Sequence, residues 1–418
     1  MNKPELLAPA GNLEKLKIAI DYGADAVYGG VSHFSLRVRS GKEFNLDTFR
    51  EGIEYVHKRG KKIYVTINGF PFNSQLKLLR NHIAQMRDLN PDGFIISTPG
   101  VLNLAKEIAP NIDIHLSTQA NVLNVLDAKF YFDIGVKRII TAREISLKDI
   151  EEIKKELPDL EVEIFVHGSM CFAYSGRCLI SSLQSGRVPN RGSCANDCRF
   201  PYTLYAENEE TGTLFKIVED EGVGTYIMNA KDLNLAPHIE DIIKLGIVDS
   251  MKIEGRTKSS YYTAITTKIY REAIDDAISG NFRRDYYISE LNTTQNRGFT
   301  DGYLIHRPFQ KLDTQSTFDQ MLMGTHQVSG IVLEPEYFMC KYSTYPNDKI
   351  EIISPAPLSD EVENEFGKIF QEDGKWFYIP YKLVAKDGRE WESVHSGNLN
   401  PIKLPAPLPI HTFFRKGI

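Results

Sequence analysis

The sequence predicts an α/β fold: a (β/α)8 barrel of the TIM type with a long cysteine-containing insertion after its seventh strand, followed by a small all-β barrel domain. Eight short apolar runs alternate with amphipathic segments across residues 1–324, and each run ends in small or polar residues. Such alternation indicates a parallel sheet, and eight units favour a closed barrel over an open sheet. After residue 325, short alternating runs separated by Pro, Gly, Asn and Asp indicate a separate all-β unit.

The expected barrel strands are short apolar runs bounded by turn residues. Two of the intervening helices show clear start signals. One, at residues 13–22, follows Asn12 as its cap, and another, at 147–157, begins where Ser146 and Asp149 resemble a capping box. In chain order, the strands are expected at residues 5–8, 26–28, 62–67, 93–96, 112–116, 138–141, 161–166 and 248–253.

Small and polar residues follow every expected strand. Loops after barrel strands form the catalytic face in nearly all such enzymes, although turns in general also favour these residue types. Their repetition over eight strands favours a site, and glycines such as Gly11 and Gly30 are expected to let a ligand approach the backbone. The larger polar side chains at these ends are Gln119, Arg143, Glu144, His167, Glu254 and Arg256.

The connection between the seventh and eighth strands, residues 168–247, is far longer than usual. We interpret it as a lid over the barrel mouth. It contains two strand-like pieces, 202–205 and 224–229, and an acidic run from Glu207 to Glu210 that is typical of a solvated hairpin tip. After the eighth strand, residues 260–278 predict a long helix that stops at Gly280.

The second domain is expected at residues 325–418 and ends in a Pro-rich tail. Only residues 361–370 have a helical period there. Cys340 lies in an apolar stretch and is expected to be a buried core thiol. The strands are expected at residues 328–332, 337–342, 349–353, 375–379 and 381–384.

Composition indicates an ordinary globular protein. Of the 418 residues, 42% are hydrophobic and 25% charged, and the net charge of -6 argues against indiscriminate attraction to nucleic acid. No run reaches the roughly eighteen apolar residues of a membrane span, and no basic-then-apolar secretory signal opens the sequence. We therefore expect a cytoplasmic protein with no membrane partner. A homo-oligomer is compatible with the sequence.

Four of the five cysteines are crowded into one segment, with the spacing C-x6-C-x15-C-x3-C. A cytosolic chain with clustered cysteines is more often metal-binding or catalytic than disulfide-bonded. Zinc usually takes two C-x2-4-C pairs, and only the second pair here fits, whereas a four-thiolate iron–sulfur cluster tolerates irregular spacing. An iron–sulfur cluster, zinc and free or catalytic thiols all remain open. The four residues are Cys171, Cys178, Cys194 and Cys198.

Arginines accompany these cysteines. Arg177, Arg187, Arg191 and Arg199 lie in the same segment. Without the thiols, a solvated loop surface would be the simpler interpretation. Beside a reactive centre, arginines favour a carboxylate or phosphate substrate, which the planar guanidinium binds with two parallel hydrogen bonds.

The run from Glu163 to Cys178, with its His-Gly-Ser-Met-Cys core, resembles the signature of the collagenase-like peptidase family, peptidase family U32. Further motifs that resemble this family begin at Glu5, Gly23, Ser117, Lys252 and Asn296. The resemblance spans residues 5–303, and the β-unit resembles the family's C-terminal domain.

Within that family the sequence is most similar to the tRNA hydroxylation branch, whose members make 5-hydroxyuridine at the wobble position and depend on prephenate. It has the Arg177-Cys178 pair, the Cys194–Cys198 pair and the C-terminal β-unit. Members of another branch, which hydroxylate ubiquinone, take their fourth cysteine farther downstream, and here no cysteine lies between Cys198 and Cys340.

The resemblance implies a redox enzyme acting on the anticodon loop of tRNA. A [4Fe–4S] cluster would be ligated by Cys171, Cys178, Cys194 and Cys198. Zinc is the alternative to this cluster. Prephenate, a small carboxylate co-substrate, or RNA phosphate would be bound by arginines. A target base must leave its stack to reach a barrel mouth, and Tyr174 is a residue on which it could stack. The predicted catalytic residues are His167, Arg177, Glu254 and Arg256, and the predicted substrate-binding residues are Gln119, Arg143, Tyr174 and Arg199.

Two other functions are open. The first is a peptidase, either metal-dependent or with Cys171 as nucleophile and His167 as base, although the sequence has no H-E-x-x-H and no G-x-S-x-G motif. A non-enzymatic RNA-binding protein with a structural metal is the third interpretation. The acidic net charge and the polar strand ends both weigh against it.

Overall fold

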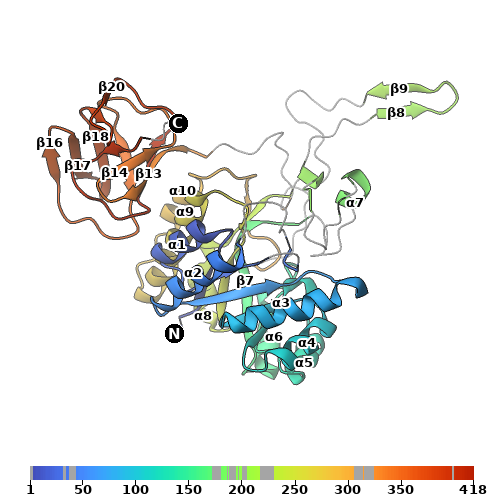
Figure 1. Cartoon of the computed structure of the whole chain (residues 1–418). Coiled ribbons are helices and arrows are strands. Elements are labelled where there is room, and N and C mark those ends of the chain that lie inside the picture. Colours follow the sequence, from blue (N-terminus) through green and yellow to red (C-terminus); the bar gives the residue numbers. More distant parts are fainter. Residues whose placement is uncertain are drawn as a thin grey trace.

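A computed structural model provides the structure of the chain (Figure 1). It describes residues 3–31, 34–36, 44–171, 180–185, 187, 194–195, 197–199, 205–216, 230–305, 314, 324–397 and 400–418.

Eight parallel strands close into a barrel, as predicted. Each strand pairs with its neighbour in chain order, and the last strand pairs with both the seventh and the first, through Ser250↔Glu163 and Glu5↔Ser250. The strands are buried almost throughout because helices cover the outside of the barrel and side chains fill its interior. They are β1 (Glu5–Pro9), β2 (Ala26–Gly29), β3 (Lys62–Ile67), β4 (Gly93–Ile96), β5 (Asp113–Leu116), β6 (Arg138–Ile140), β7 (Glu161–Ser169) and β11 (Ser250–Ile253).

The helical layer begins at the caps that the sequence indicates. The side chain of Asn12 accepts a hydrogen bond from Lys15 N at 2.9 Å, and Ser146 and Asp149 form the predicted capping box. Gly280 ends the long helix in the left-handed conformation, with φ of 77°. The helices are α1 (Leu13–Asp21), α2 (Leu46–His57), α3 (Leu76–Asp88), α4 (Pro99–Ile108), α5 (Val125–Asp133), α6 (Leu147–Glu156), α8 (Ile239–Leu245) and α9 (Ser260–Ser279).

Among the described residues, no helix is both long and apolar enough to span a membrane.

The insertion leaves and rejoins the barrel at one place. β7 continues beyond the barrel and pairs antiparallel with β10 (Asp232–Asn234), so that Ser169 lies opposite Asp232. The acidic run forms the expected hairpin tip, because Glu209 and Glu210 are exposed between β8 (Tyr205–Asn208) and β9 (Thr213–Lys216). Of the expected strand-like pieces, 224–229 lies outside the described residues, and 202–205 is described only at Tyr205. The remaining described elements of the insertion are α7 (Ile180–Ser185), η5 (Asp197–Arg199) and η6 (Ala236–His238).

After the barrel, α10 (Arg284–Leu291) and β12 (Phe299–Thr300) lead to an eight-stranded antiparallel sheet that curls around its own core, the expected all-β unit. Cys340 is buried in that core, as predicted. Its strands, in sheet order, are β16 (Val362–Asn364), β17 (Gly367–Glu372), β18 (Lys375–Pro380), β15 (Ile350–Ile353), β22 (Phe413–Gly417), β13 (His326–Glu334), β14 (Tyr337–Cys340) and β21 (Ile402–Lys403), with a small β19 (Leu383–Val384)–β20 (Glu390–Trp391) hairpin beside them.

The helical period at residues 361–370 indicates a helix, and this prediction is wrong. This segment forms the β16–β17 hairpin, in which Val362 pairs with Ile369 and Asn364 with Gly367. Gly367 and Ile369 are buried while Lys368 and Phe370 are partly exposed, which is the period of a strand. Gly367 has φ of 154°, which no helix accommodates.

The β-unit packs on α9 and α10 through a buried ion cluster. Arg415 is fully buried and binds Glu351 at 2.8 Å, Glu290 at 2.9 Å and the Tyr261 hydroxyl at 3.0 Å. We call Arg415, Glu351, Glu290 and Tyr261 the docking cluster. Since Glu290 and Tyr261 belong to α10 and α9, this cluster joins the two parts of the chain.

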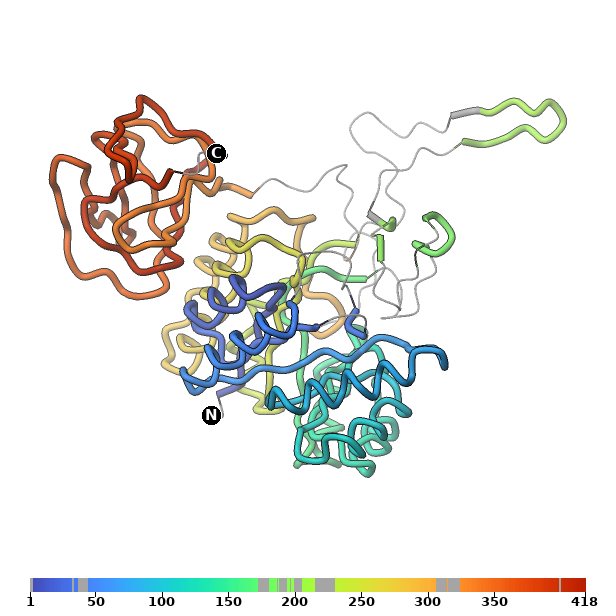
Figure 2. Tube along the Cα trace, in the orientation of Figure 1, coloured from blue at the N-terminus to red at the C-terminus, as the bar shows by residue number. Residues whose placement is uncertain are grey.

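Two further contacts support this docking. The Tyr22 hydroxyl at the end of α1 lies 2.7 Å from the Ile353 carbonyl and 2.9 Å from the His411 carbonyl. The unit also closes on itself, because Ile418 N donates to the Thr325 carbonyl at 3.0 Å, so its first and last residues meet (Figure 2).

Candidate functional site

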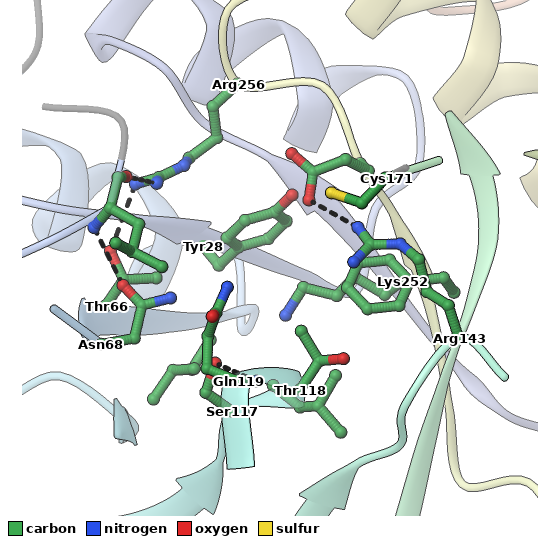
Figure 3. A pocket seen from close by; sticks show the side chains of 15 residues that line it. Tyr28, Thr66, Asn68, Ser117, Thr118, Gln119, Arg143, Cys171, Lys252 and Arg256 are labelled. Carbon is green, nitrogen blue, oxygen red and sulfur yellow. Dashed lines mark hydrogen bonds and ion pairs between the residues drawn. The ribbon is translucent and has the colours of Figure 1, made fainter. Parts of the chain in front are cut away.

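A cavity opens at the carboxyl ends of the barrel strands (Figure 3). This is the end at which barrel enzymes carry their active sites. Most of the predicted polar strand-end residues line it. The lining residues are Tyr28, Leu36, Thr66, Asn68, Ile95, Ser117, Thr118, Gln119, Ile140, Arg143, Phe165, Cys171, Lys252, Glu254 and Arg256.

The floor of the cavity is a buried amine. Lys252 Nζ lies 2.8 Å from Glu163 Oε1, and the two side chains are 5% and 0% exposed. The aromatic rings of Tyr28 and Phe165 flank the amine, with centroids 4.3 and 5.8 Å away. Lys252 is therefore held at one point and has little freedom to move toward solvent.

Below this floor, charges continue through the barrel. Glu163 also binds Arg138 at 3.1 Å, and Arg138 binds Glu5 at 2.6 Å. We call Lys252, Glu163, Arg138 and Glu5 the barrel cluster. Burial alone would raise the pKa of Glu163, but the charges of Lys252 and Arg138 outweigh it and hold that pKa below its usual value. Burial lowers the pKa of Lys252, and the carboxylate of Glu163 opposes that shift.

One wall is a loop fastened by Arg256. Its guanidinium donates to Ser35 Oγ at 2.8 Å, to Thr66 Oγ1 at 3.2 Å and to the Leu36 carbonyl. Leu36 N in turn donates to Asn68 Oδ1 at 3.0 Å. Arg256 thus lies at the cavity and also positions residues 34–36 as its wall.

The glycines at the strand ends admit parts of the chain itself. A Cβ on Gly11 would lie 2.0 Å from the Arg256 carbonyl oxygen, and one on Gly30 would lie 2.3 Å from Ser35 Oγ. The expected close approach therefore exists, but the chain makes it and no ligand is needed to explain these two residues.

The opposite wall carries Arg143, Glu254 and Cys171. Arg143 stacks on the Phe165 ring with its guanidinium carbon 4.1 Å from the centroid, and it lies 3.7 Å from Glu254. Cys171 is exposed and is the predicted metal ligand that lines the cavity. The structure therefore brings Arg143, Glu254 and Cys171 together with Arg256, as the strand-end reasoning suggested.

Gln119 reaches into the cavity from the short η3 turn (Thr118–Ala120) that follows β5 (Figure 3). Ser117 caps this turn by accepting from Gln119 N at 3.4 Å. Gln119 Oε1 is buried and has no hydrogen-bond partner among the described residues. Because a buried amide oxygen without a partner costs free energy, this atom is a natural contact for a ligand donor.

His167 lies elsewhere. It is 2% exposed and packs against the rings of Tyr262, Tyr270 and Phe299, with Nδ1 3.4 Å from the Tyr270 hydroxyl. Burial lowers its pKa to about 3, so the ring is neutral at physiological pH. It does not line the cavity that Cys171 lines. These contacts describe a core histidine that fixes the end of β7.

The remaining predicted residues fall in the insertion. Tyr174, Arg177 and Cys178 lie outside the described residues, and Arg199 is described only by its backbone in η5. Cys194 and Cys198 are half-buried and form no disulfide with another described cysteine. In the described part of the chain, no three His, Cys, Asp or Glu side chains gather closely enough to hold a metal ion. The described thiols alone thus do not form a metal site.

Sequence reasoning missed Lys252 and Glu163 as members of the site. A signal was present, because each is a charged residue between two apolar neighbours within a strand. Charged residues are almost never fully buried unless they are paired.

The chain is similar to proteins of one known family. The sequence pattern of a family described as Peptidase family U32 matches residues 11–314. A tRNA hydroxylation protein P of Helicobacter pylori (strain ATCC 700392 / 26695) is 60% identical over 417 residues, covering 99% of each chain. A tRNA hydroxylation protein P of Escherichia coli (strain K12) is 42% identical over 341 residues, 73% of this chain and 75% of that protein. A collagenase of Porphyromonas gingivalis (strain ATCC BAA-308 / W83) is 30% identical over 318 residues, 73% of this chain and 74% of that protein.

Proposed function

Because the chain belongs to peptidase family U32, we propose that it is a cytoplasmic tRNA-modifying enzyme that hydroxylates the wobble uridine to 5-hydroxyuridine in a prephenate-dependent reaction. The observation that carries this proposal is the 60% identity, over 99% of both chains, to a protein named for tRNA hydroxylation. The collagenase relative is half as identical and covers less of the chain. RNA hydroxylation is therefore the better supported activity.

The cavity supports a small carboxylate co-substrate. Its lining contains the cations Lys252, Arg143 and Arg256 and the single carboxylate Glu254. Cations in a partly closed, low-dielectric site attract an anion of small size. Prephenate belongs to that chemical class. The anticodon loop of the tRNA would approach from the same open end, with the target base turned out of its stack.

The four clustered cysteines support a [4Fe–4S] cluster, with zinc as the alternative. Thiolates suit both centres, and Cys171, which lines the cavity, would place such a centre beside the bound substrate. When bound, an iron–sulfur cluster supplies electron transfer. The residues of this chain would hold the co-substrate at Arg143 and Gln119 and shield it from water with the Arg256-fastened wall.

A peptidase remains the second candidate, because Cys171 is an exposed thiol at the cavity. Its proposed base, His167, is buried among aromatic rings and does not line that cavity. The described contacts therefore give Cys171 no histidine partner of the kind a cysteine peptidase uses.

The test is nucleoside mass spectrometry of tRNA from cells that lack the gene and carry either wild type or a variant. Wild type should restore 5-hydroxyuridine, and Cys178→Ala should abolish it together with the bound iron and acid-labile sulfide of protein purified without oxygen. Cys340→Ala, in the core of the β-unit, is the matched control and should keep both. Wild type without hydroxyuridine but with cleavage of peptide substrates would replace the proposal with the peptidase.

The metal measurement separates the two centres. About four iron and four sulfide per chain support the cluster, whereas one zinc per chain supports a structural site. Arg177→Lys should keep the metal and weaken use of the anionic co-substrate, because lysine lacks the planar fork.

A further inference from the structure

We propose that Lys252 is the residue that binds the carboxylate of the small co-substrate by an ion pair at the cavity floor, and that Glu163 and Arg138 are positioning residues for its ammonium. The identity of the ligand rests on the proposed function. The placement of a cation at the floor rests on the structure alone.

The location of Lys252 favours binding of a ligand over a purely structural role. Its side chain is 5% exposed, lies between the rings of Tyr28 and Phe165, and lines the cavity. Figure 3 shows its amine directed toward the centre of the cavity, beside Gln119. An ammonium has three N–H donors, and the 2.8 Å bond to Glu163 uses one of them.

The barrel cluster favours the charged form of this amine, because the Glu163 carboxylate opposes the burial that lowers the pKa of Lys252. Glu163 faces Lys252 with one oxygen and Arg138 with the other. Because Glu163 gives one oxygen to each cation, the Lys252 ammonium keeps two N–H donors for a ligand in the cavity. Arg138 is in turn held by Glu5 and Glu161, at 2.6 and 2.8 Å, which fixes Glu163 and therefore Lys252.

The depth of Lys252 selects the kind of anion. A phosphate in a polynucleotide backbone carries a chain on both sides, and a floor between two aromatic rings excludes it. A carboxylate at the end of a small molecule can enter. Gln119 beside it then offers a hydrogen-bonding partner, and Arg143 on the wall offers a second positive charge.

The experiment is calorimetric titration of prephenate into the holoprotein without tRNA. Lys252→Met removes the ion pair, and the double variant Lys252→Met/Glu163→Gln removes it without leaving a buried carboxylate, so that it folds if the single variant does not. We expect both to bind prephenate about 10- to 100-fold more weakly, the usual range for a lost charged hydrogen bond. Lys62→Met is the matched control, because Lys62 is exposed at the other end of β3, and it should bind like wild type.

The positioning role has its own readout. The groups facing the Lys252 ammonium are Glu163, Glu254, Arg138, His115 and the Tyr28 ring. Among them Glu163 is the hydrogen-bonded carboxylate, and its charge raises the pKa of the amine against the effect of burial. In Glu163→Gln, prephenate affinity should therefore fade at a lower pH than in wild type. An unchanged pH profile would remove Glu163 from this role.

Three results would overturn the proposal: wild type that shows no saturable binding, a folded double variant that binds like wild type, or a covalent prephenate adduct on Lys252 after borohydride reduction. The last would mean an imine in place of an ion pair. Failure of the proposed function looks different, because the wild type would then bind the carboxylate through Lys252 and yet form no hydroxyuridine in tRNA.

Discussion

The barrel cluster and the docking cluster are built from the same kinds of residue and have different consequences. Each centres on a buried arginine held by glutamates: Arg138 in one, Arg415 in the other. In the docking cluster the buried charges face other protein groups, among them Lys375, which reaches them from the surface. The barrel cluster ends in Lys252 at the floor of a cavity. Burial and pairing thus stabilise both clusters. A binding site results where a member of the cluster also faces a cavity, as Lys252 does.

The largest expected effect is on stability, from Arg415→Met. It removes the buried cation from Glu351 and Glu290 and leaves them to the half-exposed Lys375. Breaking a buried ion pair in this way costs about 3–5 kcal/mol. The midpoint of urea unfolding should fall steeply while the folded protein keeps its affinity for prephenate. Arg389→Met is the control, because Arg389 pairs with Asp387 at 62% exposure and such a pair contributes little. Equal losses from both variants would contradict the distinction between the clusters.

A smaller effect is expected from breaking the barrel cluster at its free end. Lys252→Met leaves Glu163 paired with Arg138, so the free energy of unfolding should fall by about 1–3 kcal/mol. The double variant Lys252→Met/Glu163→Gln should lose less free energy of unfolding, because neither position 252 nor position 163 then carries a buried charge. Chemical denaturation of the three proteins measures the difference. A double variant less stable than the single one would show that Glu163 acts mainly through Arg138.

Acid should weaken both clusters. Burial raises the pKa of Glu163, but the positive charges of Lys252 and Arg138 outweigh burial and hold this pKa below its usual value. The pKa of Glu351 is lowered in the same way against its burial, by Arg415. A carboxyl group with a lowered pKa stabilises the fold fully above its unfolded value, near pH 4.3, and loses that contribution as pH falls through the folded value. Unfolding free energy should therefore drop below about pH 4, by roughly 1.4 kcal/mol for each pH unit that separates the unfolded pKa from the folded one. A Glu163→Gln protein whose stability declines as steeply as that of wild type would contradict the assignment.

The smallest effect is expected at the cavity wall. Gly30→Ala places a methyl group 2.3 Å from Ser35 Oγ, which must displace the loop that Arg256 fastens. We expect a loss of about 1 kcal/mol, at the low end for overpacking, and weaker prephenate binding. Gly100→Ala in α4 meets nothing within 4 Å and should leave binding unchanged while stabilising the helix slightly. Thermal unfolding and calorimetry on both variants test this contrast.

The barrel could be predicted from sequence because its signals are local. Each strand is an apolar run ended by turn residues, and helix starts such as Asn12 and Ser146 carry their own capping signals. The β16–β17 hairpin resembles a helix in sequence because its apolar residues are spaced ambiguously over a short run. Gly367, with its positive φ, is the residue that contradicts that interpretation.

The site could be predicted only in part, because it depends on contacts between distant residues. Strand-end position is sufficient to find Gln119, Arg143, Glu254 and Arg256. It does not separate these from His167, whose ring turns into an aromatic core formed by α9 and β12. Lys252 and Glu163 escape such reasoning because their pairing requires β11 to lie beside β7, and the long insertion separates these two strands in the sequence.

The pairing of β7 with β10 has a consequence for how such proteins diversify. Since Ser169 and Asp232 lie opposite each other, the segment between them starts and finishes at adjacent points of a rigid support. A stretch anchored in this way can lengthen, shorten or be exchanged for another without opening the barrel. The same scaffold can therefore acquire a new substrate when this one segment is replaced. To exchange the specificities of two relatives, residues 170–231 are the segment to transplant.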